Sequence, residues 1–167
     1  MQKSREKTDT ILNHPDSELY AMLALQEQHV SPWDKRHLQH QSWTLIEPFI
    51  MSENSRRAVI YINNKIIDSN SFTQWPIPIP DTVAVEIFTT APKPSLVINI
   101  YRPPEEDTIT LLQQHLHTKL HHSKYDKILL LGDFNLHHPL WNPTAYTKHD
   151  PQSDVLVQIT IEQEFPS

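Results

Sequence analysis

Residues 127–141 read Lys-Ile-Leu-Leu-Leu-Gly-Asp-Phe-Asn-Leu-His-His-Pro-Leu-Trp, which is the most informative stretch of the chain. The four consecutive aliphatic residues 128–131 predict a strand that is buried on both faces, because a half-exposed strand would alternate apolar and polar residues. Gly132, the only glycine of the chain, follows directly. Its lack of a Cβ indicates either a tight strand exit or a close approach of the backbone to a ligand. Asp133 and Asn135 are therefore expected at the carboxyl end of the strand.

Asp133 and Asn135 combine a carboxylate, which only accepts hydrogen bonds, with an amide that both donates and accepts them. Such a pair can hold a cation or a proton beside a phosphate oxygen. For Gly-Asp-Phe-Asn alone, an Asx turn that closes a strand would be the better interpretation. The flanking residues 129–131 and 136–141 favour a functional site instead.

This sequence, Gly-Asp-Phe-Asn after an aliphatic strand and then Leu-His-His-Pro-Leu-Trp, resembles the endonuclease/exonuclease/phosphatase (DNase-I-like) family. Within the family it is most similar to the endonuclease domains of non-LTR retrotransposons, particularly fungal ones. The resemblance extends from about residue 3 to about residue 163, and its specific motifs are residues 26–27, 99–104 and 129–141. It implies one domain over residues 1–167 with an α/β (α+β) fold, a four-layered sandwich of two β-sheets face to face with helices outside.

The resemblance also implies hydrolysis of DNA phosphodiesters with Mg²⁺ or Mn²⁺, and it assigns roles to four residues. Glu27 matches a glutamate that binds the metal. Tyr101, Asp133 and Asn135 match residues that contact or activate the phosphate and the attacking water. Judged without the resemblance, Glu27 would be a solvated loop carboxylate and Tyr101 a packing residue with its hydroxyl in water. Arg102 could bind phosphate through its guanidinium, although a solvated surface arginine is the more common case.

Two parts of the family pattern are missing from this sequence. The family opens with a strand that bears an active-site asparagine, and it closes with further strands and a Ser-Asp-His motif. We therefore expect a domain truncated at both ends, whose second sheet is incomplete and retains little beyond the strand that ends at Gly132. A sheet face left partly uncovered favours self-association. Nicking of DNA should be far slower than by a full-length relative, or undetectable, because the missing residues position and assist the attack.

Composition restricts the function classes further. The 167 residues are enough for one domain with a sizeable core, and the absence of cysteine excludes disulfides, thiolate metal sites and a cysteine nucleophile. The net charge of −6 argues against sequence-independent electrostatic binding of nucleic acid. An enzyme that binds phosphate through a metal can nevertheless be acidic, because it needs carboxylates to hold the metal. With no signal peptide and no apolar run of membrane-spanning length, we expect a soluble intracellular protein without a membrane partner, nuclear if it targets DNA.

Hydrophobic periodicity and breaker residues predict the remaining elements. The chain should make a hairpin at residues 63–67, and three prolines make residues 75–80 an extended connection. Helices are expected at residues 3–12, 107–121 and 154–163, and strands at residues 19–25, 42–48, 57–62, 82–88 and 95–101.

Two alternatives to the nuclease stay open. One is a non-catalytic remnant or interaction domain of a retrotransposon-derived gene. The other is a zinc hydrolase built on histidines, since His117 and His121 are four apart on a predicted helix near His122 and His137 or His138. That pattern has neither an intervening glutamate nor a cysteine, so adventitious metal binding or plain solvation is the better interpretation of it.

Overall fold

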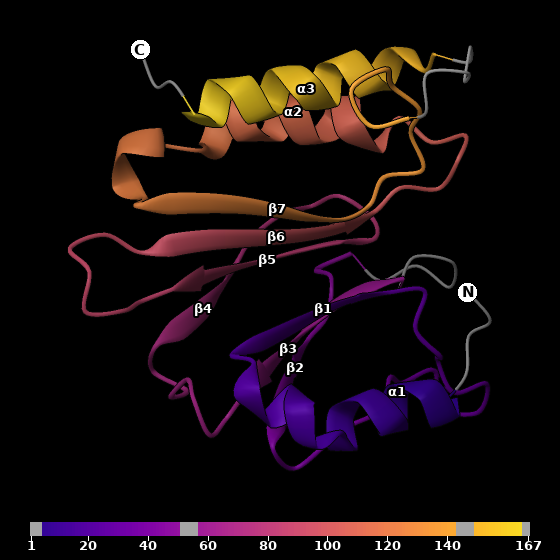
Figure 1. Ribbon diagram of the computed structural model, residues 1–167, viewed down its shortest axis with the longest axis vertical. Coiled ribbons are helices and arrows are strands. Elements are labelled where there is room, and N and C mark those ends of the chain that lie inside the picture. The colour runs from indigo at the N-terminus through magenta and orange to yellow at the C-terminus, as the bar shows by residue number, and fades with distance from the viewer. Residues whose placement is uncertain (1–4, 51–56, 143–148, 165–167) are drawn as a thin grey trace.

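The computed structural model describes residues 5–50, 57–142 and 149–164 (Figure 1). Its helices are α1 (Arg5–Asn13), α2 (Thr108–Lys119) and α3 (Pro151–Glu164), with the 3-10 helices η1 (Pro15–Leu19) and η2 (His122–Lys124). Its strands are β1 (Met22–Gln26), β2 (Trp43–Ile46), β3 (Ala58–Asn63), β4 (Phe72–Trp75), β5 (Thr82–Ile87), β6 (Ser95–Tyr101) and β7 (Lys127–Asp133).

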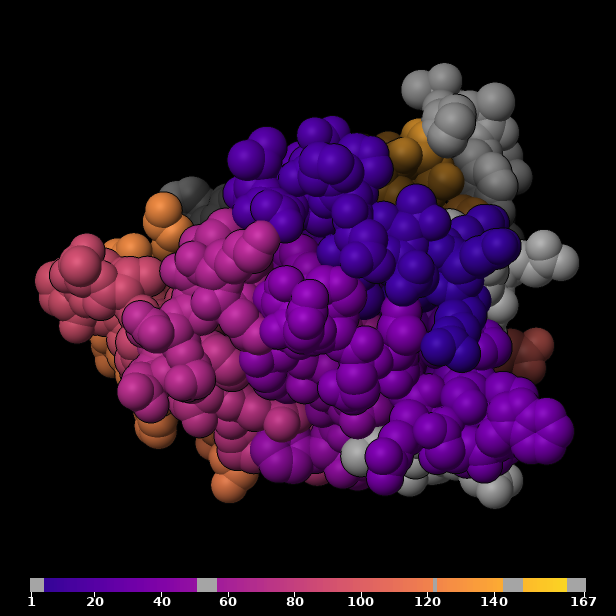
Figure 2. Space-filling view, turned by 90° about the horizontal axis from the view of Figure 1, so that it is seen from below, coloured from indigo at the N-terminus to yellow at the C-terminus, as the bar shows by residue number. Residues whose placement is uncertain are grey.

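These elements form four layers, as the sequence predicts. Helices α2 and α3 cover a sheet of strand order β4-β5-β6-β7, which faces a second sheet of order β1-β3-β2, and α1 lies outside that second sheet (Figure 1). Seen from below, the N-terminal part of the chain covers this outer face (Figure 2). The predicted α/β sandwich is therefore confirmed.

Strand β7 is the one parallel strand of its sheet, because β6 and β7 are joined by the crossover helix α2. The other described pairs, β1·β3, β2·β3, β4·β5 and β5·β6, are antiparallel. The register places Tyr101 opposite Asp133. The carboxyl ends of β6 and β7 therefore meet at one edge of the sheet.

Apolar side chains fill the three spaces between the layers. The space between the two sheets includes Ile60, Ile62, Val83 and Val85, all fully buried. A larger cluster lies between the four-stranded sheet and helices α2 and α3, and a smaller one lies on the other face of β3. Strands β3 and β5 are buried along their whole length, since both are central strands with a cluster on each face.

The distribution of strands corrects one expectation. Strand β7 belongs to the four-stranded sheet with β4, β5 and β6, whereas the second sheet is formed by β1, β2 and β3. The expectation that the second sheet would retain little beyond the strand ending at Gly132 is wrong. The expectation that β7 is buried on both faces is also wrong. Ile128 and Leu130 pack toward the helices and Leu131 packs toward the second sheet, but Leu129 is 49% exposed. Among the described residues, β7 is the last strand of its sheet, so no further strand covers its side chains.

Gly132 is needed for the approach of two strands. Its φ is +145°, and a Cβ at this position would lie 2.0 Å from the carbonyl oxygen of Ile100 on β6. The close approach that the structure shows is therefore made to the neighbouring strand β6.

Local differences from the predicted elements are small. Residues 19–21 precede β1, and Leu19 ends the 3-10 helix η1 with its side chain 78% exposed. The predicted hairpin at residues 63–67 is wrong, because Ile66 and Ile67 both donate backbone hydrogen bonds to Asn63, which makes a turn without a second strand. Among the described residues, no helix has the length and apolar character needed to cross a membrane.

Candidate active site

Three of the predicted site residues gather where strands of both sheets end. Glu27 directly follows β1, Tyr101 is the last residue of β6, and Asp133 is the last residue of β7. Side chains alternate along a strand, so Asp133 shares with Leu131 the face of β7 that is turned toward the second sheet. The Tyr101 hydroxyl donates a hydrogen bond to Glu27 Oε1 at 3.0 Å, which connects the two sheets at this edge.

The buried side chain of Asn99 stabilises this arrangement through hydrogen bonds. Its side chain is fully buried, and its amide donates to the carbonyl oxygens of Leu25 (3.2 Å) and Val59 (2.9 Å). Its Oδ1 accepts a hydrogen bond from Gln26 Nε2 at 2.5 Å. Strand β6 is thereby bonded to β1 and β3, which fixes Glu27 beside Tyr101. The sequence signal for this residue is a single amide within the β-branched run of residues 95–101.

Two of the predicted residues have a left-handed backbone conformation, Glu27 with φ 53° and Asn135 with φ 47°. Asparagine adopts this region more readily than most residues, whereas it is unusual for glutamate. Glu27 N donates to the carbonyl of Arg57 at 2.6 Å, and Asn135 N donates to Asp133 Oδ1 at 3.2 Å. Such conformations persist only where the surroundings enforce them, and they cluster at functional sites.

Asn135 is positioned by Arg102. The Asn135 amide donates to the Arg102 carbonyl at 2.8 Å, and the guanidinium Nη1 donates to the Asn135 carbonyl at 3.2 Å. The same guanidinium reaches Gln152 Oε1 (3.3 Å) and Asp150 Oδ2 (3.4 Å) near the start of α3. Arg102 is 3% exposed, so its interpretation as a solvated surface arginine is wrong. Its role in the structure is to join the turn after β7 to α3.

Arg57 is a neighbour of the site that sequence reasoning missed. Its guanidinium lies 4.8 Å from the centroid of the Tyr101 ring and bonds Asp81 Oδ2 through Nε (2.8 Å) and Nη2 (2.6 Å). Asp81 is fully buried and has φ 52°. The Arg57–Asp81 pair thus holds a positive group against Tyr101. No local pattern marks this pair, because the two residues are 24 positions apart.

The electrostatics of the site keep Tyr101 protonated. Burial raises the pKa of its hydroxyl, and the hydrogen bond to Glu27 raises it further. The negative charge of Asp133 also raises this pKa, whereas the positive charge of Arg57 lowers it. A neutral phenol is a hydrogen-bond donor at neutral pH. Tyr101 is therefore suited to donate to an anionic oxygen.

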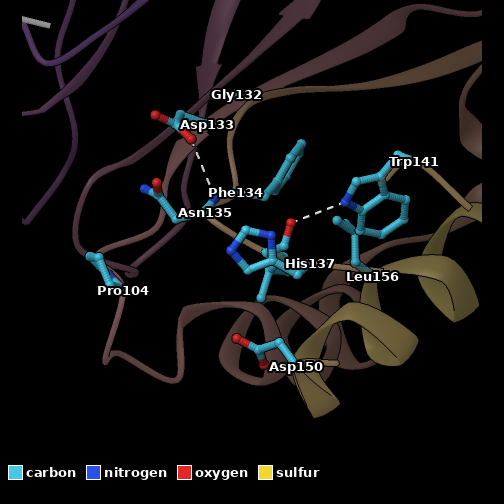
Figure 3. A pocket seen from close by; sticks show the side chains of 10 residues that line it. Pro104, Gly132, Asp133, Phe134, Asn135, His137, Trp141, Asp150 and Leu156 are labelled. Carbon is cyan, nitrogen blue, oxygen red and sulfur yellow. Dashed lines mark hydrogen bonds between the residues drawn. The ribbon is translucent and has the colours of Figure 1, made fainter. Parts of the chain in front are cut away.

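An open cavity of about 620 Å³ lies beside this edge (Figure 3). Asp133 and Asn135 are among the residues that line it, whereas Glu27 and Tyr101 are not. The structure therefore brings Glu27, Tyr101 and Asp133 together between the sheets, and it places Asp133 and Asn135 on the cavity. The lining residues are Pro104, Gly132, Asp133, Phe134, Asn135, Leu136, His137, Trp141, Asp150 and Leu156.

The donor set of this edge fits a hard divalent cation. Glu27 and Asp133 supply carboxylates from two different sheets, and Tyr101 adds a hydroxyl between them. Mg²⁺ is commonly held by one or two carboxylates together with waters and substrate phosphate. Oxygen ligands also favour Mg²⁺ and Mn²⁺ over softer metals.

Comparisons with known proteins find one matching family model and similar solved structures. Residues 95–166 match a family model described as "Endonuclease-reverse transcriptase". Among solved structures, the endonuclease domain of TRAS1, a telomere-specific non-LTR retrotransposon, is similar with a TM-score of 0.70 and 16% identity over 97% of this chain and 68% of that chain. At that identity the likeness shows the fold. Comparison with curated proteins gives no match.

The matched segment contains Tyr101, Asp133 and Asn135, and Glu27 lies before it. The resemblance predicted from the sequence is confirmed: residues 95–166 carry the sequence pattern of the endonuclease–reverse transcriptase family, and the chain has the fold of the DNase-I-like endonucleases.

Proposed function

We propose that this chain is a DNA endonuclease domain of retrotransposon origin that hydrolyses phosphodiesters with Mg²⁺ or Mn²⁺. The observation that carries the proposal is the convergence of Glu27, Tyr101 and Asp133 at one edge shared by two sheets. A DNA substrate would place the protein in the nucleus. The net charge of −6 is compatible with this role, because such a site binds phosphate through the metal.

The residues divide the chemistry among them. Glu27 and Asp133 would hold the cation, which would neutralise charge on the phosphoryl oxygens. The Tyr101 hydroxyl exchanges its hydrogen bond to Glu27 for one to a non-bridging phosphate oxygen. Asp133 and Asn135 orient the attacking water in line with the leaving oxygen, and Asn135 is kept in place by its hydrogen bonds with Arg102.

Calorimetric titration with Mg²⁺ tests the site. Asp133→Ala is expected to weaken binding by about 10-fold or more, because it removes one of two carboxylate ligands. His138→Ala is the control, and it should leave Mg²⁺ affinity unchanged since Mg²⁺ prefers oxygen to imidazole. Equal Mg²⁺ affinity of the chain and of its Asp133→Ala variant would contradict the proposal and favour the non-catalytic alternative.

We also propose that a second copy of the chain can pair with the outer edge of β7. Strand β7 is the last in its sheet among the described residues, and Leu129 is 49% exposed on it. Antiparallel pairing about Leu130 would place Lys127 opposite the second copy's Asp133, so that opposite charges meet at both ends. Pairing of this kind would also cover the candidate active site.

Sedimentation analysis over a range of concentrations tests the pairing. Leu129→Lys should shift the protein toward monomer, because edge lysines prevent strand addition. Leu111→Lys is a matched control, since Leu111 is 47% exposed but belongs to helix α2 and not to a strand edge. A monomeric wild-type chain, or equal association of both variants, would contradict pairing through β7.

A further inference from the structure

Two histidines and an aspartate form a cluster outside the candidate active site. Asp154 Oδ1, on the first turns of α3, lies 3.3 Å from His138 Nε2 and 3.1 Å from His149 Nε2. One potential ligand atom from each of the three residues lies within 4.8 Å of the others. Within the described parts of the chain, no other group of three His, Asp or Glu residues has this geometry.

The histidines singled out from sequence are arranged differently. Helix α2 ends at Lys119 and Leu120 is extended, so His121 lies beyond the helix and does not share a helical face with His117. The side chain of His122 lies outside the described part of the structure. The structure therefore favours a metal site around His138. The fold brings His138 close to His149 and Asp154, which lie 11 and 16 positions further along the chain.

The spacing of the cluster suits a tetrahedral ion. Metal–ligand bonds of about 2.0–2.1 Å place the ligand atoms of tetrahedral zinc about 3.3–3.4 Å apart. The two distances from Asp154 Oδ1, 3.3 and 3.1 Å, are close to that value. Only the two imidazoles, with ring centroids 5.7 Å apart, would have to move toward each other. Two imidazoles and a carboxylate suit zinc and leave a fourth position for water.

His138 is already oriented for this role. Its backbone N–H donates to Asn142 Oδ1 at 2.7 Å, and its ring lies 4.8 Å from the ring of Trp141. Its side chain is 13% exposed, whereas those of His149 and Asp154 are 48% and 59% exposed. One ligand is thus fixed by its surroundings, and the other two leave the position open to an incoming ion.

We propose that His138, His149 and Asp154 bind Zn²⁺, and that the ion holds the loop after β7 against α3. Binding has a cost at His138. Its Nδ1 accepts a hydrogen bond from Leu140 N at 3.1 Å, so Nε2 carries the proton of the neutral ring. Coordination through Nε2 moves that proton to Nδ1 and breaks the bond from Leu140. We therefore expect the affinity for zinc to be lowered by about 10-fold through the loss of this hydrogen bond.

The test is titration of the full chain with Zn²⁺ by calorimetry and with Co²⁺ by visible absorption. We expect one zinc equivalent and the absorption of four-coordinate Co²⁺. His149→Ala and Asp154→Asn should each weaken zinc binding by about 10-fold or more. Both positions are partly exposed, so the variants should fold, which circular dichroism checks. His117→Ala on α2 is the control and should leave zinc binding unchanged.

Two results would overturn the proposal. One is unchanged zinc affinity in both His149→Ala and Asp154→Asn. The other is an equal loss in His117→Ala, which would indicate non-specific binding by surface histidines. Asp133→Ala should not alter zinc affinity, so this titration is independent of the Mg²⁺ experiment and can fail without it.

Discussion

Replacing Asp133 by asparagine is expected to reduce magnesium-dependent nicking of supercoiled plasmid by about 10²–10⁴-fold. Asp133 is the register partner of Tyr101 and lies on the same face of the sheet, where Glu27 bonds the Tyr101 hydroxyl. Asparagine keeps the size of the side chain and an Oδ1 that can accept from Asn135 N, so the turn should persist. The variant removes only the negative charge.

Nicking should be measured with protein in excess over plasmid, so that a single cleavage event is detected. Asp107→Asn is the matched control, since Asp107 is exposed at the start of α2 and its side chain makes no capping hydrogen bond. That variant should nick like the unsubstituted chain. Nicking by Asp133→Asn at the control rate would contradict the assigned role, and no nicking by any of the three proteins would favour the non-catalytic alternative.

Gly132→Ala is expected to destabilise the fold by about 3 kcal/mol or more. Two costs add: a φ of +145° is unfavourable for alanine, by about 1–3 kcal/mol, and overpacking costs about 1–3 kcal/mol more. The added Cβ would lie 2.0 Å from the Ile100 carbonyl oxygen and 2.8 Å from Ile100 Cγ2. Strands β6 and β7 would have to separate where Tyr101 and Asp133 meet.

Urea unfolding followed by circular dichroism measures this loss. Thr73→Ala, at an exposed position of β4 in the same sheet, is the control and should stay within about 0.5 kcal/mol of the unsubstituted chain. A similarly small change for Gly132→Ala would show that β6 and β7 do not approach as closely as described.

The elements with strong local patterns were predictable from the sequence. Strand β6 and helix α2 agree with the predicted ranges within two residues, because β-branched runs and helically spaced leucines are local signals. Strand β4 was missed, since Phe-Thr-Gln-Trp is short and half polar. The division of strands between the two sheets was also wrong. It depends on contacts such as those of Asn99 with Leu25 and Val59, 74 and 40 residues away.

The candidate site was also predictable only in part. Glu27, Tyr101, Asp133 and Asn135 were predicted from short motifs at strand ends, and the structure places them near one edge. The residues that position these side chains were not predictable. The ion pair between Arg57 and Asp81, for example, joins residues that only the fold brings together. The cluster around Asp154 is likewise formed by the path of the chain and not by a sequence spacing.

Anomalous diffraction from crystals of the chain grown with Mn²⁺ would locate a metal ion bound between Glu27 and Asp133. We expect a manganese peak bonded to Glu27 and Asp133, with Tyr101 beside it. A peak at His138, His149 and Asp154 would be an additional ion and would not replace this one. Ordered Glu27 and Asp133 side chains with no manganese between them, at a concentration that supports nicking, would contradict the assignment of this edge as a metal-dependent nuclease site.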